Sequence, residues 1–259
     1  MNAVRTIQKG YLTGYVYKTA EEMGQAAADF VEKEIIELLK KKDVVTLLLS
    51  AGISQHTFHT ALAKKKSFDW GRINLMEIDE EIGLPEGHKV LCATGIKKYF
   101  QEAGANYREF FAFKSDAPDR DAECERFAKV LEEHEPDLAF IGVGINGHVA
   151  LNEPGQGKFD DQKACKVVAI SEKTKQQNID SGHYKTTDEC PKYGYTITLP
   201  ALMKMKRRFT IIPYPEKANS VYEVFFGEIR EAVPCTCVRM QDWTLFMDAD
   251  SSYLIRDLV

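Results

Sequence analysis

A glycine-rich stretch, IGVGINGHVALNEP at residues 141–154, carries the side chains best suited to proton transfer. His148 belongs to the residue type whose ordinary pKa lies near neutrality. Glu153 follows five residues later and can fold back onto the imidazole ring. A carboxylate held against an imidazole fixes its tautomer and supports acid–base chemistry. We therefore predict that His148 is an acid–base group oriented by Glu153.

Three glycines surround this histidine and predict a ligand site rather than an ordinary surface turn. Gly142, Gly144 and Gly147 leave room for the backbone to approach a ligand closely. The alternative is a surface histidine beside a turn-forming Glu-Pro pair. The glycine density and the apolar residues directly before it favour the ligand site.

Three consecutive acids stand at the end of another apolar stretch, RINLMEID at residues 72–79, whose last residue is the first of the three. Asp79 comes first, and we expect it to point into a crevice, where a carboxylate can move a proton on a bound substrate. Its position alone also fits a solvated acidic loop. For Glu80 and Glu81 we expect the solvated loop.

A small-residue turn, SAGISQ at residues 50–55, joins an apolar stretch to a helical one. The free backbone N–H groups of such a helix start can hold a phosphate, and Ser50 and Ser54 can add hydroxyl groups. Gly52 allows a tight turn with or without a ligand. The motif leaves phosphate binding and a purely structural turn equally open.

These loops must be positioned by the elements around them, and apolar patterning predicts strands and helices in alternation. The alternation implies a single α/β domain over residues 1–259, with a mostly parallel sheet flanked by helices on both faces. Ligands then bind beyond the carboxyl ends of the strands, so loops 50–55, 79–88 and 142–157 should border one crevice. The polar segment 171–192 is expected to form a flap over it. Strands are predicted at 44–49, 72–79, 137–144, 163–170, 194–200, 207–213 and 243–250, and helices at 19–42, 56–65, 94–103, 120–134 and 215–227.

The composition limits the classes of partner that we expect. The formal net charge of −5 gives no reason to expect nucleic acid or a membrane surface. No apolar run approaches the roughly 20 residues that a membrane span needs. The first residues lack the apolar core of a secretory signal, so we expect a cytoplasmic protein.

Cysteine and histidine spacing does not predict a metal site. Six cysteines are scattered along the chain, and the CTC pair at 235–237 is neither a redox motif nor a good zinc half-site. We expect these residues to be packed in or near a strand. His56 and His59 lie three residues apart without a third ligand, and we expect partly buried helix residues.

The histidine loop resembles the signature of the glucosamine-6-phosphate deaminase/isomerase family, roughly G-[hydrophobic]-G-x-[DN]-G-H followed by N-E-P. MEIDEEIGLP at residues 76–85 is similar to that family's Asp-Glu-x-x-Gly-Leu loop. The order of the predicted elements agrees over most of residues 20–250. The resemblance implies a modified Rossmann-like fold and a cofactor-free conversion of a 2-amino-2-deoxyhexose 6-phosphate to a ketose 6-phosphate plus ammonia.

The resemblance also implies roles for individual residues. His148 would open the pyranose ring, with Glu153 and Asn146 orienting it. Asp79 would take the proton from C2 and pass it to C1. Lys217 in YPEKAN matches a phosphate-binding lysine.

The sequence departs from the family at two of the positions that bind the substrate's phosphate. The family's usual Gly-Gly-Thr-Pro loop is replaced by AGIS, with Ser54 in place of Pro, and Asp180 stands where an arginine of the flap would align. His183 or Lys185 could compensate from the flap. The leucine before Asn-Glu-Pro and the missing arginine resemble the galactosamine-6-phosphate isomerase branch, so a galacto-configured substrate stays open.

Other functions remain to be separated. A 6-phosphogluconolactonase-like hydrolase shares the fold, but those enzymes usually continue their Gly-His with Thr-Ala-Ser-Leu-Phe-Pro, unlike VALNEP here. A non-catalytic sugar-phosphate sensor is a third alternative. The family contains monomers and hexamers, so a homo-oligomer is also open.

Overall fold

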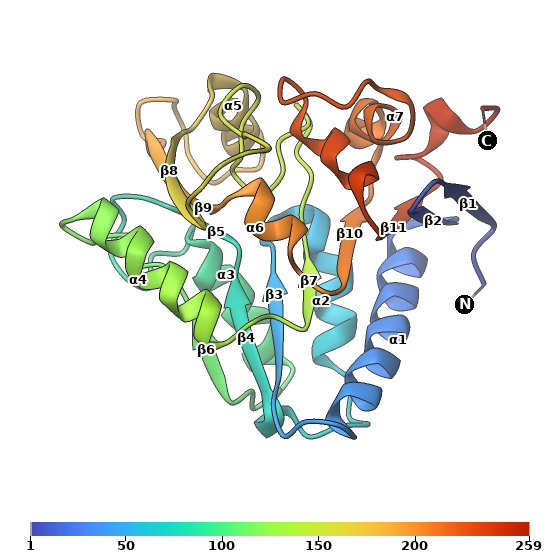
Figure 1. Cartoon of the computed structure of the whole chain (residues 1–259), viewed down its shortest axis with the longest axis horizontal. Coiled ribbons are helices and arrows are strands. Elements are labelled where there is room, and N and C mark those ends of the chain that lie inside the picture. Colours follow the sequence, from blue (N-terminus) through green and yellow to red (C-terminus); the bar gives the residue numbers. More distant parts are fainter. Residues whose placement is uncertain (1, 259) are drawn as a thin grey trace.

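An eight-stranded sheet runs through the computed structural model, which describes residues 2–258 (Figure 1). The strand order is β1-β2-β11-β10-β7-β3-β4-β6. Every neighbouring pair is parallel except the β1–β2 hairpin at the edge. The strands are β1 (Arg5–Lys9), β2 (Leu12–Tyr17), β3 (Val45–Leu49), β4 (Ile73–Glu77), β6 (Glu109–Phe111), β7 (Leu138–Phe140), β10 (Arg208–Ile212) and β11 (Trp243–Asp248).

A second, three-stranded sheet is antiparallel and separate from the first. It consists of β5 (Asp79–Glu81), β9 (Tyr193–Ile197) and β8 (Cys165–Ala169), in that order. The strands predicted near 163–170 and 194–200 therefore exist but do not extend the parallel sheet. The stretch predicted as one strand at 72–79 is divided, because β5 turns away from β4 to pair with β9.

Helices cover both faces of the large sheet. Side chains of α1 (Ala20–Leu39), α2 (His56–Ala63) and α3 (Cys92–Glu102) pack into one apolar cluster. Side chains of α4 (Arg120–Glu133), α6 (Leu199–Met203) and α7 (Ala218–Phe226) pack into another. The prediction of a mostly parallel sheet covered on both faces is thus confirmed.

The segment 171–192 contains a helix, α5 (Glu172–Asp180), at the top of the molecule in Figure 1. Ser171 caps it by accepting the N–H of Thr174. Most of its residues are partly or fully exposed, and Thr174 is its buried residue. The flap therefore begins with a helix whose buried Thr174 side chain points inward.

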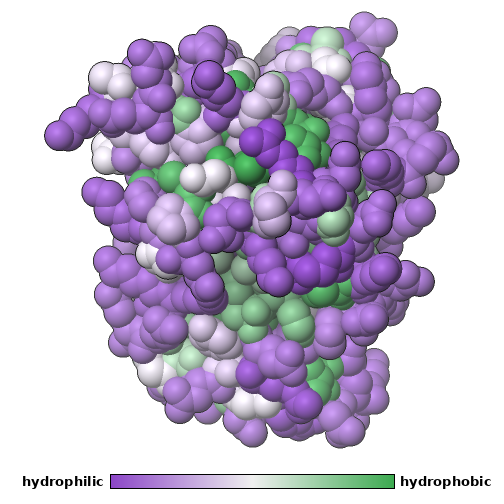
Figure 2. Space-filling view, turned by 90° about the vertical axis from the view of Figure 1, so that its left-hand side faces the viewer, coloured by the Kyte–Doolittle hydropathy of each residue, from purple (hydrophilic) through white to green (hydrophobic). Residues whose placement is uncertain are grey.

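Sequence patterning located the inner strands β3, β4, β7 and β10 well, because their burial is continuous. All five residues of β3 are buried, as expected for a strand covered on both faces. The hairpin β1–β2 and the short strand β6 were not predicted. The surface in Figure 2 is mostly hydrophilic, with apolar residues showing mainly between polar ones. Within residues 2–258, no helix is both long and apolar enough to cross a membrane.

Candidate active site

One pocket, with a volume of about 610 Å³, is lined by all three loops that the sequence predicted to meet. Loop 50–54 follows β3, Asp79 opens β5, and residues 142–151 follow β7. β7, β3 and β4 are consecutive neighbours in the large sheet, and Asp79 follows β4, so the three segments begin at carboxyl ends on the same edge. The flap contributes Thr174, Asn178 and Asp180 to the lining.

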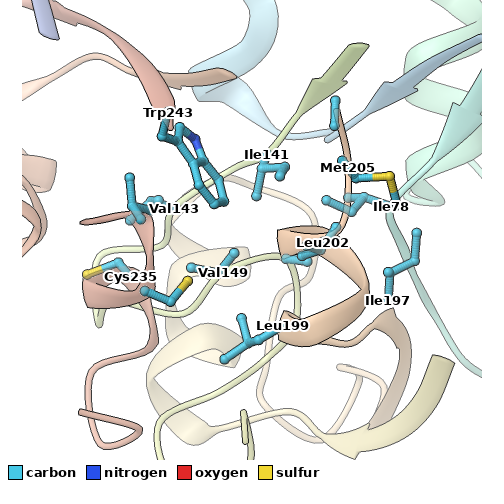
Figure 3. Close-up of a cluster of buried hydrophobic side chains, with 14 of the residues drawn as sticks. Ile78, Ile141, Val143, Val149, Ile197, Leu199, Leu202, Met205, Cys235 and Trp243 are labelled. Carbon is cyan, nitrogen blue, oxygen red and sulfur yellow. The ribbon is translucent and has the colours of Figure 1, made fainter. Parts of the chain in front are cut away.

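Apolar packing against the buried core fixes the loop that carries His148. Val143 and Val149 pair with each other as an isolated antiparallel bridge and lie in the apolar cluster with Cys235 (Figure 3). The N–H of Cys235 donates to the carbonyl of Gly147 at 2.8 Å. The histidine is thus presented on a loop whose two arms are anchored in the core.

A buried network surrounds the ring of His148. Its Nδ1 lies 3.7 Å from Oε2 of Glu153, whose side chain is 1% exposed. Asn146 Nδ2 donates to the same oxygen at 2.7 Å, and the Asn146 side-chain oxygen accepts the N–H of His148 at 3.0 Å. The structure therefore brings together the three residues that the sequence linked.

Thr174 of the flap joins this network, although nothing in the sequence singled it out. Its hydroxyl donates to Oε1 of Glu153 at 2.6 Å and lies 3.4 Å from Nδ1 of His148. Because its hydrogen is directed at the carboxylate, its oxygen can accept a hydrogen bond from the N–H at Nδ1, in addition to the one it accepts from the hydroxyl of Ser171. That arrangement favours the tautomer with hydrogen on Nδ1 and leaves Nε2 for a substrate.

Glu153 is held in its charged form. Burial alone favours the neutral acid, but the neighbouring imidazole, Thr174 and Asn146 outweigh burial and lower the pKa of Glu153 to about 2. The carboxylate therefore stays negative beside His148 across the neutral range. It can stabilise an imidazolium when the ring takes up a proton.

The glycines of this loop make room for protein atoms. A Cβ on Gly144 would lie 2.2 Å from Nε2 of His148, so only glycine lets the ring rest on this backbone. Gly147 has a φ of +82°, and a Cβ there would lie 2.9 Å from Val233. The expected close approach to a ligand is thus in part a close approach of the histidine ring.

Asp79 is half-buried at the start of β5, where it pairs with Thr196 of β9. Burial, together with the charges of Glu80 and Glu81, raises the pKa of Asp79 to about 8. A carboxyl with that pKa can take up and release a proton near neutral pH. This property suits a general base more than a solvated surface acid.

The expectation that Glu80 and Glu81 lie in a solvated loop is wrong. Glu80 is 1% exposed and accepts the N–H groups of Cys92 and Ala93 at the start of α3, at 2.9 and 3.0 Å. A buried carboxylate at a helix N-terminus is stabilised by the free N–H groups there. Sequence spacing could not reveal this, because the helix begins 12 residues later.

Glu81, which is 8% exposed, ties the flap to the second sheet. Its carboxylate accepts from Asn178 Nδ2 at 2.8 Å and from the hydroxyl of Tyr184. The flap is therefore held at two places, by Glu153 through Thr174 and by Glu81. Both anchors are carboxylates in or next to the pocket.

The predicted phosphate loop is only partly available. The hydroxyl of Ser50 donates to the carbonyl of Phe140 at 2.8 Å and accepts the N–H of Gly142 at 2.6 Å, so its hydrogen is already used. Gly52 is exposed with a φ of +98° and leads into the 3-10 turn Ile53–Gln55, which precedes α2. No side chain accepts a hydrogen bond from the N–H groups at the start of this 3-10 turn or of α2. Ser54 lies in the pocket lining.

Lys217 reaches the pocket from the 3-10 turn Pro215–Lys217 after β10. It is 6% exposed, and its Nζ donates to the carbonyl of Val143 at 2.8 Å. Burial lowers the pKa of Lys217 to about 8. Of the flap residues considered for phosphate, His183 and Asp180 line the pocket, whereas Lys185 is exposed and outside its lining.

The remaining polar candidates lie apart from this chemistry. His59 is completely buried rather than partly, and burial lowers its pKa to about 3, while His56 is exposed. Cys235 and Cys237 are buried as expected, but in the 3-10 helix Pro234–Met240. The described part of the chain contains no group of three or more potential ligands placed to hold a metal ion.

Comparison with known proteins places this pocket in context. Residues 18–247 match the family model described as glucosamine-6-phosphate isomerases/6-phosphogluconolactonase. A glucosamine-6-phosphate deaminase of Bacillus cereus strain B4264 is 27% identical over 248 residues, which cover 94% of this chain and 89% of that protein. A glucosamine-6-phosphate deaminase of Bacillus thuringiensis strain Al Hakam has the same identity and coverage.

Solved structures share the fold. A monomeric glucosamine-6-phosphate deaminase superposes with a TM-score of 0.80 at 24% identity, covering 93% of this chain and 99% of that one. A 6-phosphogluconolactonase from Plasmodium vivax gives a TM-score of 0.76 at 14% identity, covering 98% of this chain and 97% of that one. These likenesses establish the architecture and leave the reaction to be argued from the site.

Proposed function

Because the chain belongs to the family of glucosamine-6-phosphate isomerases and 6-phosphogluconolactonases, we propose that it deaminates and isomerises a 2-amino-2-deoxyhexose 6-phosphate. The products would be a ketose 6-phosphate and ammonia. The observation that carries the proposal is the placement of Asp79 and His148 in one pocket from two separate chain segments. The deaminases at 27% identity over most of the chain support the same choice.

In this proposal His148 opens the sugar ring. Its Nε2 takes the proton of the anomeric hydroxyl, and the resulting imidazolium returns a proton to the ring oxygen. Glu153 stays charged beside Nδ1 and stabilises the imidazolium between these steps. Asn146 and Thr174 keep that carboxylate in place.

Asp79 then carries the isomerisation. Its carboxylate removes the proton from C2 and forms an enolamine, and the carboxylic acid delivers a proton to C1. The double bond moves to the C2–nitrogen bond, and water hydrolyses that imine to a ketone and ammonia. A pKa of about 8 lets one side chain serve as base and then as acid. One water is consumed for each ammonia released.

The phosphate would be held at the loop 51–54 and by Lys217. Free N–H groups at the start of a helix attract anions, and a lysine ammonium adds a positive charge. Asp180 lines the pocket where a flap cation would assist, so we expect a weaker grip on phosphate than an arginine would give. Both the gluco and galacto epimers are candidate substrates, because the missing flap arginine resembles the galactosamine-6-phosphate isomerase branch.

The decisive experiment measures ammonia and ketose 6-phosphate released from glucosamine 6-phosphate and galactosamine 6-phosphate in parallel. Equal amounts of both products from one epimer support the proposal. Hydrolysis of 6-phosphogluconolactone without any ammonia would instead assign a lactonase, in which His148 activates water and Asp79 is dispensable.

Asp79→Asn separates a catalyst from a sensor. Asparagine has a similar shape but cannot take up the C2 proton, so we expect turnover to fall by about 10²- to 10⁴-fold. Binding of the sugar phosphate should stay within about tenfold, since no group that holds the phosphate has changed. Unchanged turnover would remove Asp79 from the mechanism.

A further inference from the structure

A tyrosine in this pocket adopts a backbone conformation that normally requires glycine. Tyr214 has a φ of +78° and a ψ of +147°, between β10 and the turn that carries Lys217. Among residues 2–258, Ala150 is the other non-glycine residue with positive φ, and it also lines the pocket. Such a conformation is a genuine outlier for a bulky side chain.

The surrounding structure forces Tyr214 into this shape. Its N–H donates to both oxygens of Asp248, at 3.2 and 3.1 Å. Asp248 is the last residue of β11, is 2% exposed, and also accepts the N–H of Ser251 at 2.7 Å. A buried carboxylate is therefore used to fix one strained turn.

A glycine would form the same turn without strain, so the tyrosine side chain requires another explanation. The side chain lines the pocket, half-buried, together with Tyr99 and Lys217. Lys217 lies three residues later in the same turn, with its Nζ on the carbonyl of Val143. The turn thus delivers an aromatic ring and a buried cation to one cavity.

We propose that Tyr214 is a substrate-binding residue whose ring packs against the bound sugar phosphate beside Lys217, and that Asp248 maintains the strained turn for this purpose. The inference rests on the proposed function for the ligand class. An aromatic face suits the C–H surface of a hexose, and its half-buried phenol can donate a hydrogen bond to the ligand.

Three variants test the two parts of this proposal. Tyr214→Phe keeps the ring, whereas Tyr214→Ala and Tyr214→Gly remove it, and only glycine relieves the backbone strain. Binding is measured by calorimetry with glucose 6-phosphate and galactose 6-phosphate, which lack the amino group and cannot be deaminated. Thermal unfolding of each variant is measured without ligand.

We expect affinity to follow the ring and stability to follow the backbone. The alanine and glycine variants should each bind about three- to tenfold more weakly than the wild type, while the phenylalanine variant stays within about threefold. The glycine variant should unfold at a higher temperature than the alanine variant, by about 2 °C or more. Tyr11→Ala removes an exposed ring outside the pocket lining and should leave the affinity unchanged.

Wild-type affinity in both the alanine and the glycine variant would overturn the recognition role. Equal unfolding temperatures for these two variants would overturn the strain. The proposed reaction is tested separately by ammonia release. If the wild-type protein releases no ammonia but binds both hexose phosphates, and the variants show the expected pattern, the role of Tyr214 stands and the proposed reaction does not. If the wild-type protein binds neither hexose phosphate, both the role of Tyr214 and the proposed reaction are wrong.

Discussion

The catalytic rate should depend on pH as a narrow bell centred near pH 8. The proposed base must be ionised, and burial with the charges of Glu80 and Glu81 raises the pKa of Asp79 to about 8. The proposed phosphate ligand must be protonated, and burial lowers the pKa of Lys217 to about 8. The first group gains the required charge state as pH rises, and the second loses it.

The height of the bell follows from these two values. If only the form with ionised Asp79 and protonated Lys217 reacts, about one quarter of the free enzyme is active at pH 8. About one twelfth is active at pH 7 or pH 9, and about one hundredth at pH 6. We therefore expect kcat/KM to fall about threefold one pH unit on either side of the maximum, and about eightfold at pH 6.5.

Two substitutions should move the two limbs separately. Glu81→Gln removes a charge that raises the pKa of Asp79, so the acidic limb should shift to lower pH. Glu86→Gln is the matched control, because it removes the same charge from an exposed position in the loop that follows. Lys217→Arg keeps its charge at high pH, so the alkaline limb should flatten even if overall binding changes.

The assay is initial-rate ammonia release between about pH 6.5 and 9.5, above the second ionisation of a phosphate ester at about pH 6. The inhibition constant of glucose 6-phosphate, measured over the same range, reports the Lys217 limb without the proton transfer by Asp79, because binding of this inhibitor requires no such transfer. An acidic limb that is absent above pH 6.5, or identical in Glu81→Gln and Glu86→Gln, would refute the assignment of Asp79 as the base.

Two further predictions concern the setting of His148. Thr174→Val removes the hydroxyl that donates to Glu153 and should lower kcat about three- to tenfold, whereas Thr174→Ser keeps the hydroxyl and should retain activity. Both variants are measured by steady-state kinetics. If both match the wild type, Thr174 does not position His148. Gly144→Ala places a Cβ 2.2 Å from Nε2 of His148, so the ring must move and kcat should fall about 100-fold or more. Gly104→Ala, directly after α3 with a φ of +68° and no atom within 4 Å of the added Cβ, lies outside the pocket lining and is the control, with unchanged kinetics and about 1 kcal/mol lower stability in denaturant unfolding.

Local sequence signals determined the frame of the site. Mostly apolar stretches predicted β3, β4 and β7, because a strand buried on both faces is rich in apolar residues, although β4 also buries Asn74 and Glu77. Parallel strands end on one edge, so the loops that follow them were expected to meet, and they do. The glycines around His148 likewise predicted a ligand site in this loop, and the loop lines the pocket.

Tertiary structure alone decided the surroundings of the charged groups. The sequence predicted solvated acids at Glu80 and Glu81, yet a helix start 12 residues later holds Glu80 and the flap, about 100 residues later, covers Glu81. The flap threonine meets Glu153 across 21 residues, and no local pattern encodes that distance. The pKa of Asp79 depends on those placements, because burial and the neighbouring charges set it.

The strand pairings show the same division. The hairpin β1–β2 escaped prediction because β1 is a short, partly exposed edge strand, and β2 is placed by pairing with β11 at the other end of the chain. Strand β5 leaves the main sheet because β9, more than 100 residues later, offers its partner hydrogen bonds. Residue types therefore determined which groups can transfer protons, whereas long-range pairing decided which of them are buried and face one another.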